Sequence, residues 1–104
     1  MAYKVIVSRN AIADLAKYIN YLLVEKQSRQ AAVNTLNDYE ETLKELEVVA
    51  GSLKILENPK LSERGLRRIN FRRHNYFILY FIEDDTAVVT NVFHSSEDFE
   101  NKMN

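Results

Sequence analysis

One stretch of the sequence constrains the fold more than any other: residues 76–82, YFILYFI, are apolar without interruption. A run of this length is typical of a strand near the middle of a sheet, because both faces of such a strand are covered. The polar turn sequence Glu83-Asp84-Asp85 follows it directly. Residues 76–82 therefore predict a central strand against which the rest of the chain packs.

The segments on either side of this run predict two further strands. Residues 66–71 alternate roughly, with Ile69 and Phe71 on one face and Arg68 and Asn70 on the other, which is the pattern of a half-buried strand. Residues 72–75 form the turn between these strands, and residues 87–93 form the last strand. The second half of the chain thus predicts three consecutive antiparallel strands.

The first half of the chain predicts a short strand and two helices. Residues 3–7 form the strand, and Ser8 or Asn10 caps a helix that ends near residues 25–27. Ser28 begins the second helix, and the short connection makes the two a helical hairpin that covers one face of the sheet. Apolar residues at steps of three and four predict one buried face on each helix: Ile12, Leu15, Ile19, Leu22 and Leu23, then Leu36, Tyr39, Leu43, Leu46, Ala50 and Leu53.

The remaining segments complete a single predicted domain over residues 1–104. Asn58-Pro59 predicts extended backbone before the next element, since proline disfavours helix in the residue ahead of it. Ser95 or Ser96, with the acids that follow, predicts the start of a short helix that docks Phe99 and Met103. The predicted fold class is α+β in the order β-α-α-β-β-β(-α), with a helical hairpin on a small, mainly antiparallel sheet.

Composition narrows the classes of function. The chain has no cysteine and only two histidines, so we expect neither a metal centre nor a cofactor. The formal net charge of -1 argues against a protein that coats nucleic acid without specificity. No apolar run approaches the roughly 20 residues that span a bilayer, and the start lacks a signal sequence, so we expect a cytoplasmic protein without a membrane partner.

Positive charge is nevertheless concentrated in one part of the sequence. Five arginines fall within ten positions, and such a density of guanidinium groups can bind phosphates or an acidic partner. The alternative is that acidic side chains within residues 38–47 pair with them. The candidate binding residues are Arg64, Arg67, Arg68, Arg72 and Arg73.

Aromatic residues and histidines near this segment have simpler alternatives. The tyrosines and phenylalanines of residues 76–81 are expected to pack in the core, with only Tyr80 retained as a functional candidate. His94, at the predicted end of the last strand, either caps the following turn or takes part in catalysis. His74 is expected in a solvated turn, and residues 83–85 are expected to form a hairpin turn rather than a metal site.

The order of elements, together with these residues, resembles the RelE/ParE superfamily of bacterial toxins from type II toxin–antitoxin modules, known also as plasmid stabilisation systems. The resemblance covers nearly the whole chain. It rests on the opening strand with its helical hairpin, on Gly-x-Arg-Arg at 65–68, on Tyr-x-x-x-Tyr at 76–80 and on His94. It implies a toxin that arrests growth and forms a hetero-oligomer with a small antitoxin, whose tail wraps the sheet and hairpin.

The resemblance implies one of two activities. RelE-like members enter the ribosome and cleave mRNA. This likeness would place Arg68 against the reacting phosphate and would place Arg72 and Arg73 on neighbouring phosphates. His94 or Tyr80 would then transfer the proton. ParE-like members inhibit DNA gyrase as binding proteins and need no catalytic residues. Whether the chain is an enzyme therefore depends on the branch.

Three features favour the ParE-like branch. The net charge is not basic, the final residues HSSEDFENKMN are acidic, and the predicted hairpin over residues 8–53 is long. A second alternative is an inactive relative that serves as an interaction module.

Overall fold

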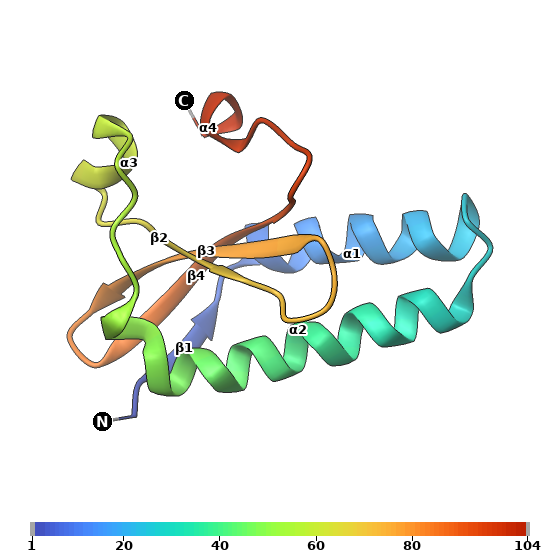
Figure 1. Ribbon diagram of the computed structural model, residues 1–104, viewed down its shortest axis with the longest axis horizontal. Helices are drawn as coiled ribbons and strands as arrows, with labels where there is room; N and C mark the ends of the chain where they lie inside the picture. Colours follow the sequence, from blue (N-terminus) through green and yellow to red (C-terminus); the bar gives the residue numbers. More distant parts are fainter. Residues whose placement is uncertain (1, 104) are drawn as a thin grey trace.

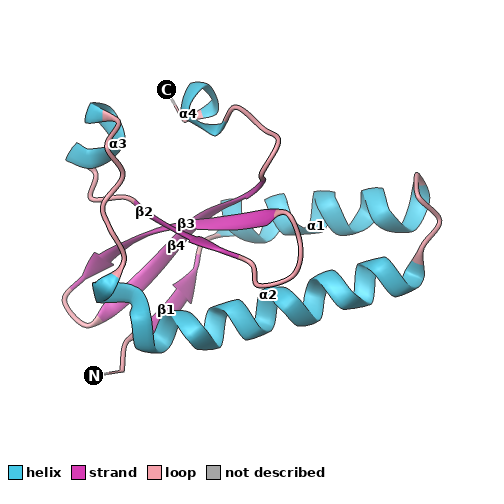
Figure 2. Cartoon of the chain, in the orientation of Figure 1, coloured by secondary structure: helices cyan, strands magenta, loops and turns pink. Residues whose placement is uncertain are grey.

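The structure, a computed structural model, describes residues 2–103. The strands are β1 (Lys4–Val7), β2 (Arg67–Asn70), β3 (Tyr76–Glu83) and β4 (Thr86–His94) (Figure 1). The described helices are α1 (Arg9–Val24), α2 (Arg29–Val49), α3 (Pro59–Glu63) and α4 (Phe99–Lys102), with a 3-10 turn at Ala50–Ser52 (Figure 2). The predicted α+β class and order of strands are confirmed.

The apolar run forms the central part of a four-stranded mixed sheet with strand order β1-β4-β3-β2. β3 pairs antiparallel with both β2 and β4, whereas β1 is parallel to β4. Ile78 and Tyr80 face the core beneath the helical hairpin, while Phe77 and Leu79 face a smaller apolar cluster on the opposite side. The central strand thus contributes to a core on each face of the sheet, as its uninterrupted apolar sequence predicts.

Helices α1 and α2 begin where the sequence predicts. The hydroxyl of Ser8 accepts a hydrogen bond from the Ala11 N–H, and the hydroxyl of Ser28 accepts one from the Ala31 N–H. Each serine thereby satisfies a backbone donor that the first turn of a helix leaves free. The two helices lie side by side as a hairpin (Figure 1).

Side chains of α1 take the place of a strand along half of β4. The pairing with β1 ends at Val89, so the following backbone groups of β4 lack a strand neighbour on that side. Polar residues of the Ser8–Tyr18 segment satisfy them, which fixes α1 against the sheet. The Ser8 hydroxyl donates to Thr90 O (3.0 Å), Val92 N–H donates to the Asp14 carboxylate (3.0 Å), and His94 N–H donates to the Tyr18 hydroxyl (3.3 Å).

Glu97 joins this network and attaches the C-terminal segment to α1. Its carboxylate accepts hydrogen bonds from the His94 N–H, the Tyr18 hydroxyl and the Lys102 ammonium. Burial alone would raise the pKa of Glu97, but the hydrogen bonds from Lys102, Tyr18 and His94 outweigh it and lower the pKa to about 2. The network therefore favours the ionised carboxylate.

Asp38 connects α2 to the turn between β2 and β3. Its side chain is buried and accepts backbone hydrogen bonds from Arg72 (3.1 Å), Arg73 (2.9 Å) and His74 (2.9 Å). The ring Nδ1 of His74 lies 2.7 Å from the same carboxylate. Burial raises the pKa of Asp38, but His74 and the three N–H groups more than reverse this effect, so that the pKa is lowered overall.

Part of the predicted apolar face of the hairpin is exposed rather than buried. Ile12 is 57% exposed, Leu23 45% and Leu36 37%, so the prediction was wrong for these residues. For Leu23 and Leu36 the physical reason is that the far half of the hairpin extends past the sheet (Figure 1). Ile12 lies in the first turn of α1, where the residues that pack on the main core are instead Ala11, Leu15 and Tyr18.

Helix α3 was not predicted. The extended backbone expected before Pro59 is present at Asn58. The Asn58 side chain, however, caps a helix by accepting hydrogen bonds from the Lys60 and Leu61 N–H groups. Pro59 is the first helical residue, a position where its missing donor has no cost. Gly65, with φ of +69°, ends the helix in the left-handed conformation that glycine adopts readily.

The C-terminal helix also differs in its start. Asp98, rather than Ser95 or Ser96, precedes α4, and its side chain makes no capping hydrogen bond. The predicted docking is confirmed, because Phe99 and Met103 pack on the cluster around Phe77.

Replacing Asp38 with alanine is expected to lower the free energy of unfolding by about 2–4 kcal/mol, because three backbone N–H groups of the turn lose one buried acceptor together. Urea unfolding followed by circular dichroism measures this change. Glu45→Ala is the control: its ion pair with Arg72 is exposed and 3.7 Å long, so its loss should cost less than about 1 kcal/mol. Equal losses in the two variants would contradict the assigned role of Asp38.

The low pKa of Glu97 predicts how the C-terminal segment responds to acid. The pKa lies below the ordinary value of 4.5, so the stabilisation is fully present above that pH and is lost as the pH falls toward about 2. In NMR spectra, the His94 amide of the wild type should titrate with a midpoint near pH 2. Glu97→Gln should abolish this titration, and a wild-type midpoint near pH 4.5 would argue against the network.

Candidate functional site

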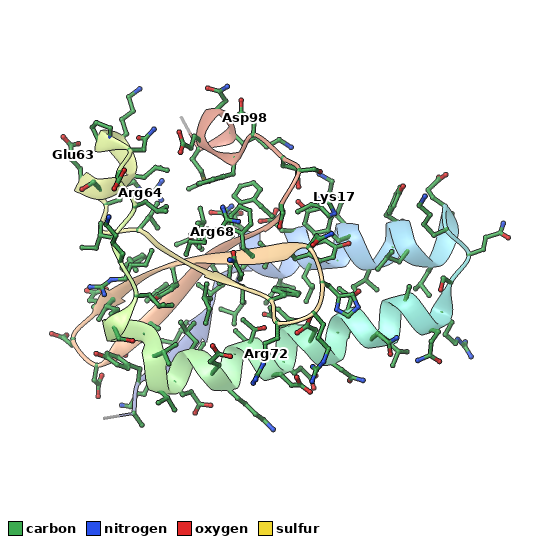
Figure 3. All side chains as sticks on the ribbon, in the orientation of Figure 1. Lys17, Glu63, Arg64, Arg68, Arg72 and Asp98 are labelled. Carbon is green, nitrogen blue, oxygen red and sulfur yellow. The ribbon has the colours of Figure 1, made fainter. Side chains whose placement is uncertain are left out.

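The five candidate arginines do not form one surface, and Figure 3 shows three of them, Arg64, Arg68 and Arg72, at separate places on the molecule. Arg64 follows the last residue of α3, while Arg67 and Arg68 are neighbours on β2 and therefore face opposite sides of the sheet. Arg72 and Arg73 lie in the turn beside α2. The density of positive charge in the sequence thus separates into distinct environments in the structure.

Arg67 has a structural role at the end of α2. Its Nη1 donates to the carbonyls of Ala50 (3.4 Å), Gly51 (3.1 Å) and Leu53 (2.8 Å). These carbonyls belong to the turn where the helix ends and lack helical partners of their own. The Nη1 group of Arg67 is therefore used within the protein.

Arg68 lies on the opposite face, over the smaller apolar cluster. Its guanidinium carbon is 3.7 Å from the centre of the Phe77 ring, and its Nε donates to Asn70 Oδ1 at 2.8 Å. The Phe99 ring of the C-terminal helix is on the same side, 5.9 Å away. Burial lowers the pKa of Arg68. Cation–π contact with Phe77 thus accounts for the position of this arginine.

Arg72 and Arg73 pair with acids of α2. Arg73 Nη1 is 2.5 Å from Glu41 Oε2, and Arg72 Nη1 is 3.7 Å from Glu45 Oε2. Together with Asp38, these glutamates recur at steps of three and four, so they share one face of the helix. The acidic internal partner considered as an alternative is therefore observed.

Tyr80 and His94 lie on the helical side of the sheet, away from Arg68. Tyr80 is fully buried and its hydroxyl donates to Ala50 O at 2.8 Å; burial raises the pKa of Tyr80 to about 12. Arg68 is opposite Leu79, one residue before Tyr80, so the two candidates point to opposite faces. The structure therefore does not bring Arg68 together with either proposed proton-transfer group.

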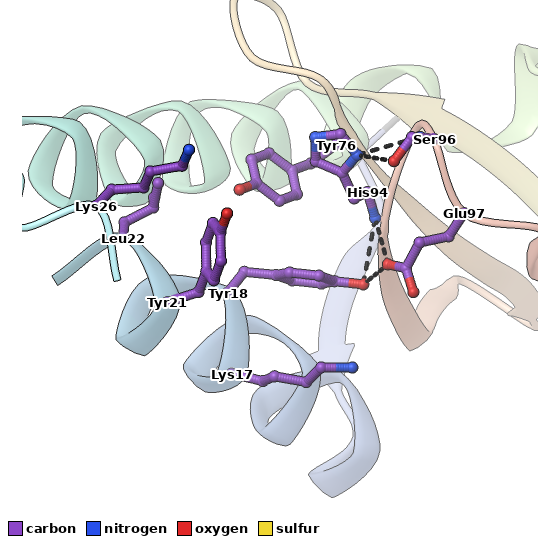
Figure 4. A pocket seen from close by; sticks show the side chains of 9 residues that line it. All are labelled: Lys17, Tyr18, Tyr21, Leu22, Lys26, Tyr76, His94, Ser96 and Glu97. Atoms are coloured by element: carbon purple, nitrogen blue, oxygen red, sulfur yellow. Dashed lines mark hydrogen bonds between the residues drawn. The ribbon is translucent and has the colours of Figure 1, made fainter. Parts of the chain in front are cut away.

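His94 instead borders a cavity of about 580 Å³ between α1 and the ends of β3 and β4 (Figure 4). Its ring packs edge-on to Tyr76 with centroids 5.0 Å apart, and its Nδ1 lies 2.7 Å from the Ser96 hydroxyl. The cavity combines aromatic walls with positive charge. Its lining consists of Lys17, Tyr18, Tyr21, Leu22, Lys26, Tyr76, His94, Ser96 and Glu97.

Sequence reasoning missed this cavity because its residues come from distant segments. Tyr76 was expected only in the core, and Tyr21 and Lys26 were not singled out. The available signal was the repeated tyrosine on α1: Tyr18 and Tyr21 are three residues apart, so one face of the helix carries both.

A second feature is an apolar groove along the hairpin. It runs along α1 beside Leu36 of α2, and nearly all of its lining is apolar. This accounts for the exposure of the residues predicted to be buried. The groove is lined by Ile12, Leu15, Ala16, Ile19, Asn20, Leu23 and Leu36.

Two further observations concern metals and membranes. Among residues 2–103, histidines and carboxylates nowhere gather in a group of three or more that could hold a metal ion. None of the helices in that part of the chain is both long and apolar enough to cross a membrane.

Comparison with solved structures identifies close likenesses of fold. A chain of the chromosomal ParDE toxin–antitoxin system from P. aeruginosa has a TM-score of 0.71 and 19% identity, covering 89% of this chain and 96% of that one. A chain of the toxin–antitoxin complex RelBE2 from Mycobacterium tuberculosis has a TM-score of 0.58 and 23% identity, with 90% and 99% covered. A conserved hypothetical protein from Helicobacter pylori has a TM-score of 0.56 and 16% identity, with 91% and 97% covered. At these identities the likeness concerns the fold.

The sequence comparisons are more specific. No curated protein matches the chain. The family model described as "ParE toxin of type II toxin-antitoxin system, parDE" matches residues 5–99, from the second residue of β1 to the first residue of α4. Because the match extends over nearly all of the described elements, the chain belongs to the ParE toxin family of type II toxin–antitoxin systems.

Proposed function

We propose that this protein arrests bacterial growth by binding and inhibiting DNA gyrase, and that a cognate antitoxin neutralises it. Both steps would take place in the cytoplasm, where we expect the toxin, its target and its antitoxin to meet. The proposal needs protein–protein recognition and no chemistry by this chain.

The observation that carries the choice of gyrase is the separation of the candidate catalytic groups. A nuclease needs its proton-transfer group and its phosphate-stabilising cation at one reacting centre. Arg68 packs on the ring of Phe77 on one face of the sheet. Tyr80 is buried on the opposite face of the sheet, where its hydroxyl already donates to Ala50 O. This arrangement supports a binding protein over the RelE-like alternative, and the match to the ParE family agrees with it.

The groove on the hairpin supports a polypeptide partner. Ile12, Leu23 and Leu36 expose apolar side chains along one continuous surface of α1 and α2. An amphipathic segment laid in such a groove would bury this surface, which is a common mode of peptide recognition. Two of the similar folds come from a ParDE system and a RelBE2 complex, so an antitoxin is the partner we propose.

Inducing the protein without its antitoxin in a sensitive bacterium should stop DNA synthesis before protein synthesis. Pulse labels for the two processes over the first minutes measure the order. Coexpression of the antitoxin, which we expect to be encoded by a short open reading frame adjacent to the gene, should restore growth. Earlier arrest of protein synthesis with cleaved mRNA would favour the ribosome-dependent nuclease, and the absence of arrest would favour an inactive relative.

The variant Tyr80→Phe separates packing from catalysis at the buried tyrosine. The ring remains, and only the hydroxyl that donates to Ala50 O is lost, so the free energy of unfolding should fall by about 0.5–1.5 kcal/mol. We expect the variant to arrest growth as the wild type does at equal expression. Loss of arrest in a variant that denaturant unfolding shows to be folded would return Tyr80 to the list of catalytic candidates.

A further inference from the structure

The outer end of the cavity between α1 and β3 presents three hydrogen-bond donors to one region of space. The hydroxyls of Tyr21 and Tyr76 point toward each other, with the Lys26 ammonium beside them (Figure 4). Lys26 Nζ is 5.9 Å from the centre of the Tyr21 ring. Within residues 2–103, neither hydroxyl has a hydrogen-bond partner and Lys26 forms no ion pair. All three donors are thus available to a ligand.

Packing holds one wall of this site in place. Tyr76 is only 8% exposed, and its ring lies between Tyr18, at a centroid distance of 5.1 Å, and His94, at 5.0 Å. Its hydroxyl therefore points into the cavity from a fixed ring. A donor that is already oriented loses little conformational entropy when a ligand binds.

The charges around the cavity favour an anion. Lys17 and Lys26 contribute positive charge, and neither forms an ion pair in the described part of the chain. The one carboxylate in the lining, Glu97, is already paired with Lys102. The cavity is thus locally positive in a protein whose formal net charge is -1.

The lining also indicates which anion. It includes no arginine, the residue whose planar fork is suited to binding phosphate at two points. Two hydroxyls and one ammonium instead match the few acceptor positions of a carboxylate. Leu22 also lines the cavity, so an apolar side chain lies in the same wall as the donors. A carboxylate carried on a polypeptide with apolar neighbours would use both features.

We propose that this cavity binds an aspartate or glutamate side chain of the antitoxin, held by Lys26 and by the hydroxyls of Tyr21 and Tyr76. An apolar residue next to that acid covers Leu22. The inference rests on the proposed antitoxin partnership and assigns it a specific ionic anchor, separate from the apolar groove of the hairpin and from the arginines.

The test is the affinity of the purified toxin for the product of the adjacent open reading frame, measured by calorimetry at two salt concentrations. Lys26→Gln should weaken binding by about tenfold or more and reduce its salt dependence, because a charge-assisted hydrogen bond is lost. The double variant Tyr21→Phe/Tyr76→Phe keeps both rings and should weaken binding to a similar extent. Lys60→Gln on α3 removes the same charge elsewhere and should leave the affinity unchanged.

A double-mutant cycle identifies the acid. Each aspartate and glutamate of the antitoxin is changed to its amide, and one of these changes should weaken binding to the wild-type toxin but not to Lys26→Gln. If every acid gave the same effect in both backgrounds, or if Lys26→Gln bound as tightly as the wild type, the proposed anchor would be wrong while the antitoxin partnership stood.

Two other outcomes also overturn the anchor. If the wild-type toxin neither bound the product nor was neutralised by it, the proposed partnership itself would fail. If a single-stranded RNA bound the free toxin and Lys26→Gln abolished that binding, the cavity would be a nucleic-acid site.

Discussion

The buried carboxylate of Asp38 is the interaction on which the arrangement of this protein most depends. It gathers three consecutive backbone N–H groups of the β2–β3 turn onto the middle of α2. The loss of a buried acceptor that several donors share is destabilising, because all of these hydrogen bonds are lost together. The turn is therefore held close to the helix, and the glutamates one and two turns further along α2 can pair with Arg72 and Arg73. Two of the five arginines that look in the sequence like a free basic cluster are thus the counterparts of an acidic helix face.

The candidate functional residues lie on two different faces of the sheet. The alternation of side chains along β2 sends Arg67 toward the helical hairpin and Arg68 toward the C-terminal helix. Tyr80 and His94 belong to the first side, with the cavity that Lys26 borders. Such a division suits a protein that presents several binding surfaces. It does not suit one that focuses an arginine, a tyrosine and a histidine on a single phosphate.

Local patterns predicted the elements well because they depend on neighbouring residues. The run at residues 76–82 required a central strand, and Ser8 and Ser28 cap their helices as their side chains dictate. Two local errors are the missed helix α3 and the start of α4, and the other errors concern distant partners. Periodicity gave the apolar face of α1 correctly but could not show that Ile12 and Leu23 would face a groove with no sheet above it. The cavity likewise depends on tertiary contacts between α1, β3 and β4, and the positions of Arg72 and Arg73 depend on their contacts with α2.

The most direct test of a binding mechanism uses purified components. DNA gyrase is incubated with relaxed plasmid and ATP, the toxin is added, and supercoiled product is quantified, with toxin and antitoxin premixed as the control. The account predicts that the toxin suppresses supercoiling and that the antitoxin restores it. Full gyrase activity at a toxin concentration well above that of the enzyme, together with cleavage of mRNA on translating ribosomes, would contradict it.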